Sequence, residues 1–250
     1  MKSKLSIVLA GILIYLVFLI AYMPASQVIG RIQIPANIAL GPVSGTLWNG
    51  TAKSVEVNGL LINELDWQLS FLPLLWGSVS LDLDAGNDRQ SDEISFRGEI
   101  TTNWSSFTRF DSDDFIIYLP TDQVLANVQL PLPVKAGGRF RVIINELEFN
   151  QRCQTLEANG EWLNAQVAGT QGSIQLGSFG AILSCVDNVI VADVAEPNML
   201  GLSLIARVSG MRNISVTGRF KPDASLPDEV HQAAQFFGQQ DAQGYREIKL

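Results

Sequence analysis

The sequence predicts a mainly β protein: one N-terminal transmembrane helix followed by a long, curved, meandering antiparallel sheet with few short helices. Three observations support this fold class. Residues 5–23 form an apolar run without a charge. Beyond it, apolar and polar residues alternate with period two in roughly a dozen short segments separated by turn signals. Only residues 227–238 have apolar spacing typical of an amphipathic helix.

The apolar run is long enough, at about 1.5 Å per residue, to cross most of a hydrocarbon core about 30 Å thick. Lys2 and Lys4 precede it, and the next charge is Arg31. Positive charge before the run favours a cytoplasmic N-terminus and an exported remainder. The alternative is a cleaved signal peptide, which has a shorter apolar region, of about 7–15 residues, and a better cleavage site than residues 22–26 provide. We therefore predict an uncleaved anchor.

The exported part begins with a proline-containing lead-in and a glycine-rich segment. In that segment Gly45 and Gly50 bracket Leu47 and Trp48. Glycine permits backbone angles and close approaches that other residues do not, so we expect a strand interrupted by a bulge or turn. The predicted division of the chain is a cytoplasmic tip (1–4), a transmembrane helix (5–23), a lead-in (24–42), a β domain (43–222) and a C-terminal tail with a short helix (223–250).

The first half of the β domain alternates clearly. Asn58-Gly59 predicts a tight hairpin between two strands. Two more strands are predicted over residues 78–85 and 93–100, the former with Asp82 and Asp84 on its polar face. A sheet with one wet face explains this pattern and a helix does not. On the return strand of the hairpin, the predicted apolar face holds Leu61, Leu65, Trp67, Leu69 and Phe71.

The second half is less regular. Residues 103–114 are predicted to form a loop or a short helix, and apolar runs follow at 115–119 and 124–130. A change of apolar parity predicts a bulge near Asn145, and Asn159-Gly160 predicts another turn between strands. The repeated short strands predict a meandering sheet, closed or strongly curved. Its later strands are expected at 140–149, 173–176, 181–185, 189–194, 202–208 and 214–220.

Charge limits the possible partners. Without Lys2 and Lys4, 15 of the 17 basic residues remain against 25 acidic ones, a net charge of −10. Such an acidic domain repels nucleic acid and anionic lipid heads, so nucleic-acid binding is excluded.

Both cysteines, Cys153 and Cys185, lie in the exported part. An even pair in an oxidising compartment favours a disulfide, and closing this loop would stabilise the fold by about 3–4 kcal/mol. Two buried free thiols are the alternative. Their spacing excludes a CxxC redox pair.

No catalytic constellation is present in the sequence. The single histidine, His231, has no Gly-x-Ser-x-Gly partner motif, and no phosphate loop or dinucleotide fingerprint occurs. The carboxylates of 111–114 lack the glycine and the third alternating acid of a calcium loop, so they indicate a solvated turn. We predict no enzyme activity and no catalytic, cofactor-binding or metal-ligating residues.

The tryptophans allow two interpretations. They fill the core, or they line an apolar groove that meets lipid acyl chains or a partner segment. The five are Trp48, Trp67, Trp76, Trp104 and Trp162.

Several segments together resemble the type II secretion system protein N family, also called general secretion pathway protein N. These are the charged tip and membrane span, the two distant cysteines, and the segments Gly45–Ala52, Leu65–Trp67, Leu72–Gly77 and Gly218–Pro222. The motif residues, to which we assign a structural role, are Gly45, Leu47, Trp48, Gly50, Trp67 and Gly77.

The resemblance implies a single-pass inner-membrane protein of Gram-negative bacteria, with a cytoplasmic N-terminus and its bulk in the periplasm. It implies an accessory part in moving folded periplasmic proteins across the outer membrane, through contacts with other secretion subunits. The family supplies no catalytic residues. It is more distantly similar to AsmA-like periplasmic proteins, so the alternative is an envelope protein that binds or passes lipid along an apolar groove of its sheet.

Overall fold

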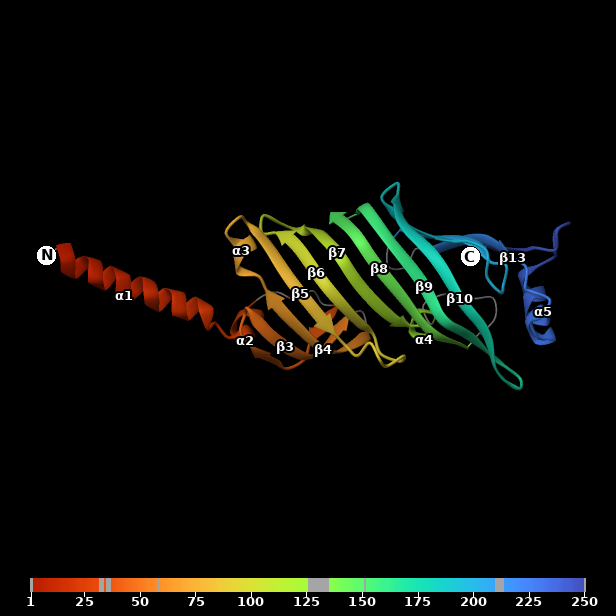
Figure 1. Cartoon of the computed structure of the whole chain (residues 1–250), viewed down its shortest axis with the longest axis horizontal. Helices are drawn as coiled ribbons and strands as arrows, with labels where there is room; N and C mark the ends of the chain where they lie inside the picture. Colours follow the sequence, from red (N-terminus) through yellow and green to blue (C-terminus); the bar gives the residue numbers. More distant parts are fainter. Residues whose placement is uncertain are drawn as a thin grey trace.

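The computed structural model describes residues 2–31, 34, 37–57, 59–125, 135–150, 152–209 and 214–249. Helix α1 stands away from the rest of the chain and leads into one long twisted sheet (Figure 1). The helices are α1 (Lys2–Ala21), α2 (Ala25–Ile29), α3 (Phe71–Leu74), α4 (Thr121–Leu125) and α5 (Asp228–Ala234), which continues into the 3-10 turn η1 (Gln235–Phe237).

The strands follow one another along the chain. They are β1 (Ile38–Leu40), β2 (Val43–Gly45), β3 (Asn49–Val57), β4 (Leu60–Leu69), β5 (Ser78–Ala85), β6 (Ser95–Asn103), β7 (Ser106–Pro120), β8 (Ala136–Asn150), β9 (Cys153–Gly169), β10 (Gly172–Val186), β11 (Val189–Val194), β12 (Ser203–Val208), β13 (Ile214–Phe220) and β14 (Arg246–Lys249).

All described strands belong to one 14-stranded antiparallel sheet. From β3 to β14 each strand pairs with the next in sequence, while β1 and β2 both pair with β3. The predicted mainly β, meandering antiparallel architecture is confirmed. β1 and β14 stand at the two ends of the strand order, which is therefore open among the described strands.

The alternation predicted for the first half is confirmed, with two corrections. Phe71, which was predicted on the apolar face of the return strand, lies beyond β4 in α3 and is 55% exposed. Asp82 and Asp84 are exposed on β5, between side chains that face the core. On β4, however, Leu61 is 56% exposed, whereas Ile62 is buried. The positive φ of Glu64, +48°, interrupts the period-two pattern. Leu65 then returns to the core side, so the prediction that Leu61 shares its face was wrong.

The prediction for residues 103–114 was also wrong. β7 begins at Ser106, and its first residues pair with β6. Hydroxyl groups support this pairing: Thr102 Oγ1 donates to the Arg109 carbonyl at 2.6 Å, and Ser112 Oγ donates to the Glu99 carbonyl at 2.7 Å. Because several acidic residues lie in this strand, its apolar alternation is hidden.

The second predicted Asn-Gly turn is not a turn. Asn159 pairs with Ile143 of β8 on one side and with Ile182 of β10 on the other, in the middle of β9. A Cβ at Gly160 would lie 2.9 Å from Leu183 Cδ1. The glycine therefore permits close packing within the sheet rather than a reversal of the chain.

Other local predictions have mixed outcomes. Val57 pairs with Leu60 and Gly59 has a φ of +84°, as a two-residue hairpin requires; Asn58 lies outside the described residues. The bulge near Asn145 is confirmed by a register shift. Segments 173–176 and 181–185 form one strand, β10, with irregular pairing around Gly177. The helix predicted at 227–238 is present as α5 and η1. Residues 126–130 of the predicted apolar run 124–130 lie outside the described residues.

Three apolar clusters lie along one face of the sheet, which we call the apolar face. The first, between β3 and β6, is covered by α2 through Ala25 and Ile29. The third, around Ala165 and Phe179, is covered by Leu226 and Val230 near α5. The middle one, around Phe115, is built from strand residues alone among those described.

In the part of the chain that the structure describes, no helix is both long and apolar enough to span a membrane. The predicted transmembrane helix over residues 5–23 is therefore not confirmed by the structure.

Candidate functional site

The family motif forms the junction between α1 and the sheet. Its first part is the β2–β3 hairpin, in which Gly45 pairs with Gly50. Gly45 has a φ of +85°, a conformation that disfavours other residues. Thr46 and Asn49 close the turn: the Thr46 N–H donates to the Asn49 carbonyl at 2.8 Å, and the Asn49 N–H donates to Thr46 Oγ1 at 3.1 Å.

Trp67 of β4 holds the hairpin from the apolar face. Its side chain is buried, with 9% of its surface exposed. The ring lies so close over Gly50 that a Cβ there would overlap it. Its Nε1–H donates to the Leu47 carbonyl at 3.2 Å. The Trp67 indole thus satisfies a backbone carbonyl of the turn, and only glycine at position 50 leaves room for it.

Trp48 connects the hairpin to α1. Its Nε1–H donates to the Ile20 carbonyl at 2.8 Å, and the N–H of the preceding Leu47 donates to the Met23 carbonyl at 2.9 Å. The last carbonyls of a helix lack partners within the helix, so the indole satisfies one of these groups. The Trp48 carbonyl accepts a bond from the Leu69 N–H at 2.8 Å, which ties the junction to β4.

The Trp48 ring also reaches the connection between β4 and β5. It packs against Phe71 of α3, with ring centroids 5.6 Å apart and planes at 63°, a favourable edge-to-face arrangement. At the end of this connection Gly77 has a φ of +81°, and its carbonyl accepts a bond from the Trp104 N–H at 3.1 Å. The β6–β7 turn is therefore held against the α3 connection.

The structure brings five of the six motif residues into one junction: Gly45, Leu47, Trp48, Gly50 and Trp67. Gly77 lies in the neighbouring connection. Sequence reasoning missed the acceptors Ile20 and Met23 and the ring partner Phe71. A tryptophan between two glycines is a signal for such a contact, but its acceptor is 28 positions away.

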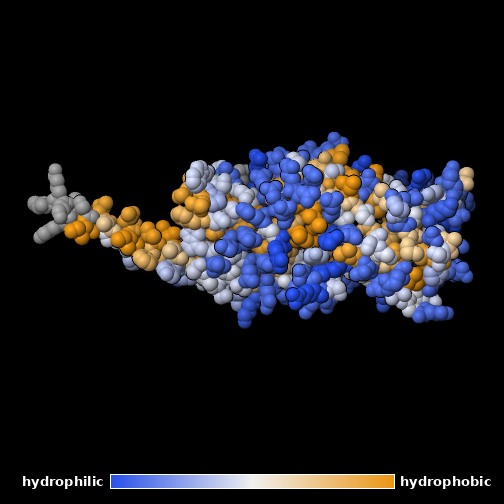
Figure 2. All heavy atoms as spheres, viewed as in Figure 1, coloured by the Kyte–Doolittle hydropathy of each residue, from blue (hydrophilic) through white to orange (hydrophobic). Residues whose placement is uncertain are grey.

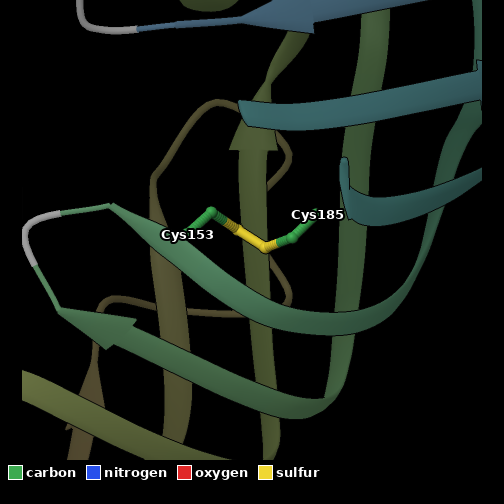
Figure 3. Close-up of a disulfide and its surroundings, with 2 residues drawn as sticks. All are labelled: Cys153 and Cys185. Carbon is green, nitrogen blue, oxygen red and sulfur yellow. A yellow bond between two sulfur atoms is a disulfide. The ribbon is translucent and has the colours of Figure 1, made fainter. Parts of the chain in front are cut away.

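The two cysteines form the second predicted feature. A Cys153–Cys185 disulfide links β9 to the neighbouring strand β10 (Figure 3). Their Cα atoms are 5.7 Å apart, and Cys153 is buried. The predicted bridge is present, and the alternative of two free thiols was wrong.

Charged side chains of the sheet form ion pairs on its polar face, mostly across neighbouring strands. Arg97 contacts Asp84 at 2.9 Å, and this hydrogen bond, followed by the charge of the carboxylate, raises the pKa of Arg97. Arg109 contacts a glutamate of β8 and lies 3.5 Å from Asp111 of its own strand. The turn predicted for residues 111–114 was wrong, because these residues lie within β7. These groups are largely exposed, so each pair contributes little stability. Among the described residues, no three His, Cys, Asp or Glu side chains are placed to hold a metal ion.

The Arg141–Glu161 pair, at 2.5 Å, borders a hollow of about 510 Å³ that also reaches Ile182 and Pro197. The neighbouring apolar-face positions pack their rings instead: Trp162 lies between Phe140 and Phe179, with centroid separations of 5.6 and 5.4 Å. The hollow is therefore on the side of the sheet opposite this aromatic stack.

Comparison with known proteins identifies the family. Residues 36–249 match the model of "Type II secretion system (T2SS), protein N". The chain is 28% identical to the Type II secretion system protein N of Aeromonas hydrophila over 250 residues, which cover 98% of this chain and 96% of that protein. It is 26% identical to that of Vibrio cholerae over 234 residues, 90% of this chain and 88% of that protein. No solved structure gives a significant match. The chain belongs to the type II secretion system protein N family.

Proposed function

We propose that this protein is a non-enzymatic inner-membrane component of the type II secretion machinery, which exports folded periplasmic proteins across the outer membrane. It acts by contacting other secretion subunits. The family match over residues 36–249 carries the proposal, because it covers nearly the whole sheet and not only a short motif.

The proposed location is the inner membrane, with a cytoplasmic N-terminus and the sheet in the periplasm. Residues 5–23 contain no charge and follow Lys2 and Lys4. The described side chains of α1, from Ile7 to Ile20, are exposed, and the helix presents an apolar surface apart from the sheet (Figure 2). An exposed apolar helix of this kind is stabilised by lipid. The Cys153–Cys185 disulfide fits the oxidising periplasm.

Fusion and extraction experiments test the location. We expect alkaline phosphatase fused after residue 250 to be active, and the chain to resist extraction from membranes at alkaline pH. As the matched control, replacing residues 1–23 by a cleavable signal peptide releases the sheet into the periplasm. An inactive fusion, or a full chain that alkali extracts as readily as the control, would contradict the anchor.

Contacts with secretion subunits are tested by photocrosslinking in living cells. Ile182 is a suitable position, because it is an apolar side chain that is 66% exposed beside the polar-face hollow. We expect a photoreactive residue there to capture other secretion subunits, identified by mass spectrometry, in cells whose secretion it still supports. The control position is Leu176, which is buried on the apolar face. Capture of lipid alone would contradict the proposal.

The second candidate is an envelope protein that binds or passes lipid. One observation favours it: the middle apolar cluster, around Phe115 and Ile144, is lined by strand residues without a covering helix among those described. Native mass spectrometry of the full chain purified from membranes distinguishes the two. A stoichiometric lipid that is lost when Ala158, buried in this cluster, is changed to Asp would favour lipid handling. Absence of such lipid favours the secretion component.

A further inference from the structure

Two connections at the α1 end of the sheet carry exposed apolar side chains. One is α3 with the residues that follow it, between β4 and β5, and the other is the β6–β7 turn. Figure 2 shows apolar surface at this end, where α3 lies beside the end of α1. We call the group the aromatic patch; its side chains are 55–77% exposed and consist of Phe71, Leu72, Leu75, Trp76 and Trp104.

The patch is larger than scattered surface residues would produce. A large aromatic side chain has about 150–250 Å² of surface. At the exposed fractions given above, the five side chains together present several hundred Å². The largest apolar patch on an ordinary monomer is about 300–600 Å² and is often functional. The patch is therefore of the size at which apolar surfaces often bind something.

The surroundings of the patch contain no charge along the chain. Between Asp66 and Asp82 every residue is uncharged, and the same is true between Glu99 and Arg109. This separates the patch from the remainder of the domain, which is strongly acidic and has ion pairs on its polar face. An acidic protein partner or an anionic headgroup would find no lysine or arginine here. The chemistry suits the glycerol and upper acyl region of a bilayer, where tryptophan is enriched.

The patch is continuous with the end of α1. Trp48 donates to the Ile20 carbonyl at 2.8 Å, and the same ring packs on Phe71 of the patch. Tyr22, directly after α1, is also exposed. Only the Trp48 side chain therefore separates the patch from the end of α1. If α1 leaves a bilayer at this end, the patch lies at the surface of the bilayer.

We propose that the aromatic patch is seated in the interfacial layer of the outward-facing leaflet, as a second membrane attachment beside α1. This inference rests on the proposed anchor. Two attachments, the helix and the patch, fix the orientation of the sheet relative to the membrane. A helix joined to the sheet by a flexible linker would leave that orientation free. Because the patch has no basic residue, its insertion is independent of anionic lipid.

Tryptophan quenching in nanodiscs tests the inference with the full chain. The discs contain phosphatidylcholine brominated near the carbonyl end of its acyl chains. We compare the wild type with the double variant Trp76→Phe, Trp104→Phe and with the matched control Trp162→Phe, whose ring lies in the distant stack on the apolar face. The quenched fraction of the tryptophan fluorescence falls from about three fifths in the wild type to about one third in the double variant, where Trp48 is the one interfacial tryptophan among the three that remain. It does not fall in the control.

A second variant guards against a direct effect of the tryptophan changes. Leu72→Ser with Leu75→Ser retains all five tryptophans but weakens insertion, so quenching decreases while the far-ultraviolet circular dichroism is unchanged. Elution of the chain with the disc reports the anchor separately. A chain absent from the discs would overturn the anchor and this inference with it. A chain present in the discs, with equal quenching in the wild type and both double variants, would overturn only the inference and indicate a patch covered by protein or water.

Discussion

The two ends of the sheet consist of similar antiparallel strands but differ in what covers their apolar side chains. At the far end α5 covers the apolar face through Val230, and Glu229 of that helix accepts bonds from the backbone and hydroxyl of Thr170 in the β9–β10 turn. The disulfide links β9 and β10 at the ends of these strands that lie away from the residues covered by α5. At the α1 end the indoles of Trp48 and Trp67 bind backbone carbonyls, and the α3 connection leaves apolar side chains exposed. At the far end the apolar face is covered by the chain's own helix. At the α1 end apolar side chains remain exposed and available for a contact.

The largest effect is expected from deleting a buried aromatic ring at either end. Trp67→Ala and Phe179→Ala should each lower the free energy of unfolding by about 3–5 kcal/mol, because both rings are buried. Only Trp67→Ala should also expose the segment between α1 and β2 to limited proteolysis, since Trp67 holds the Leu47 carbonyl. Urea unfolding and proteolysis of the two variants measure this. Equal cleavage in both would remove the distinction between the ends.

Removing the disulfide should lower the stability of the sheet without affecting the junction with α1. Cys153→Ser with Cys185→Ser should lower the free energy of unfolding by about 3–4 kcal/mol, from the greater chain entropy of the unfolded state. Cleavage between α1 and β2 should stay at the wild-type level. Urea unfolding with and without reductant provides the measurement; a wild-type midpoint that reductant leaves unchanged would argue against the stabilising bridge.

A single methyl group tests the close packing at the junction. Gly50→Ala should cost about 1–3 kcal/mol, because its Cβ would overlap the Trp67 ring. Gly180→Ala is the matched control on β10, where a Cβ meets no atom within 4 Å; its effect should stay within about 0.5 kcal/mol. Thermal unfolding of both variants makes the comparison, and similar losses would show that the Gly50–Trp67 contact is not specific.

The smallest expected effect is the loss of one hydrogen bond. Trp48→Phe keeps a ring against Phe71 but removes the donor to the Ile20 carbonyl, at a cost of about 1 kcal/mol. Because the bond joins α1 to the hairpin, cleavage between α1 and β2 should increase while the unfolding of the sheet hardly changes. Tyr22→Phe, next to the helix end but without a bond in the junction, should leave cleavage at the wild-type rate.

Much of the sheet is predictable from sequence because β5 and its neighbours have one solvent-exposed face. Apolar and polar residues, such as Leu81 and Asp82, therefore alternate along these strands. Where acidic residues interrupt this alternation, as at Asp113 in β7, the strand is missed. The Asn159-Gly160 pair shows a different limit. A local dipeptide is the same in a turn and in a crowded strand, and the Leu183 side chain that demands the glycine is distant in sequence.

The junction was predictable in composition but not in geometry. The glycines and tryptophans of the motif are recognisable as a group, and Gly45 with its positive φ fits the expected turn. The acceptor of the Trp48 indole, however, is a helix carbonyl that any residue would supply. The side chain at position 20 therefore does not indicate this contact. Contacts to the backbone leave no residue-specific signal, and the sequence therefore showed which residues matter without showing what they bind.

The measurement that tests the junction most directly is hydrogen exchange of the tryptophan indole N–H groups in the full chain, followed by NMR in nanodiscs. Trp48 and Trp67 both donate to backbone carbonyls, and Trp67 is buried in the sheet. We expect the Trp48 indole to be protected to a degree similar to that of Trp67. Exchange of the Trp48 indole many times faster than that of Trp67 would contradict the claim that the motif fastens α1 to the sheet.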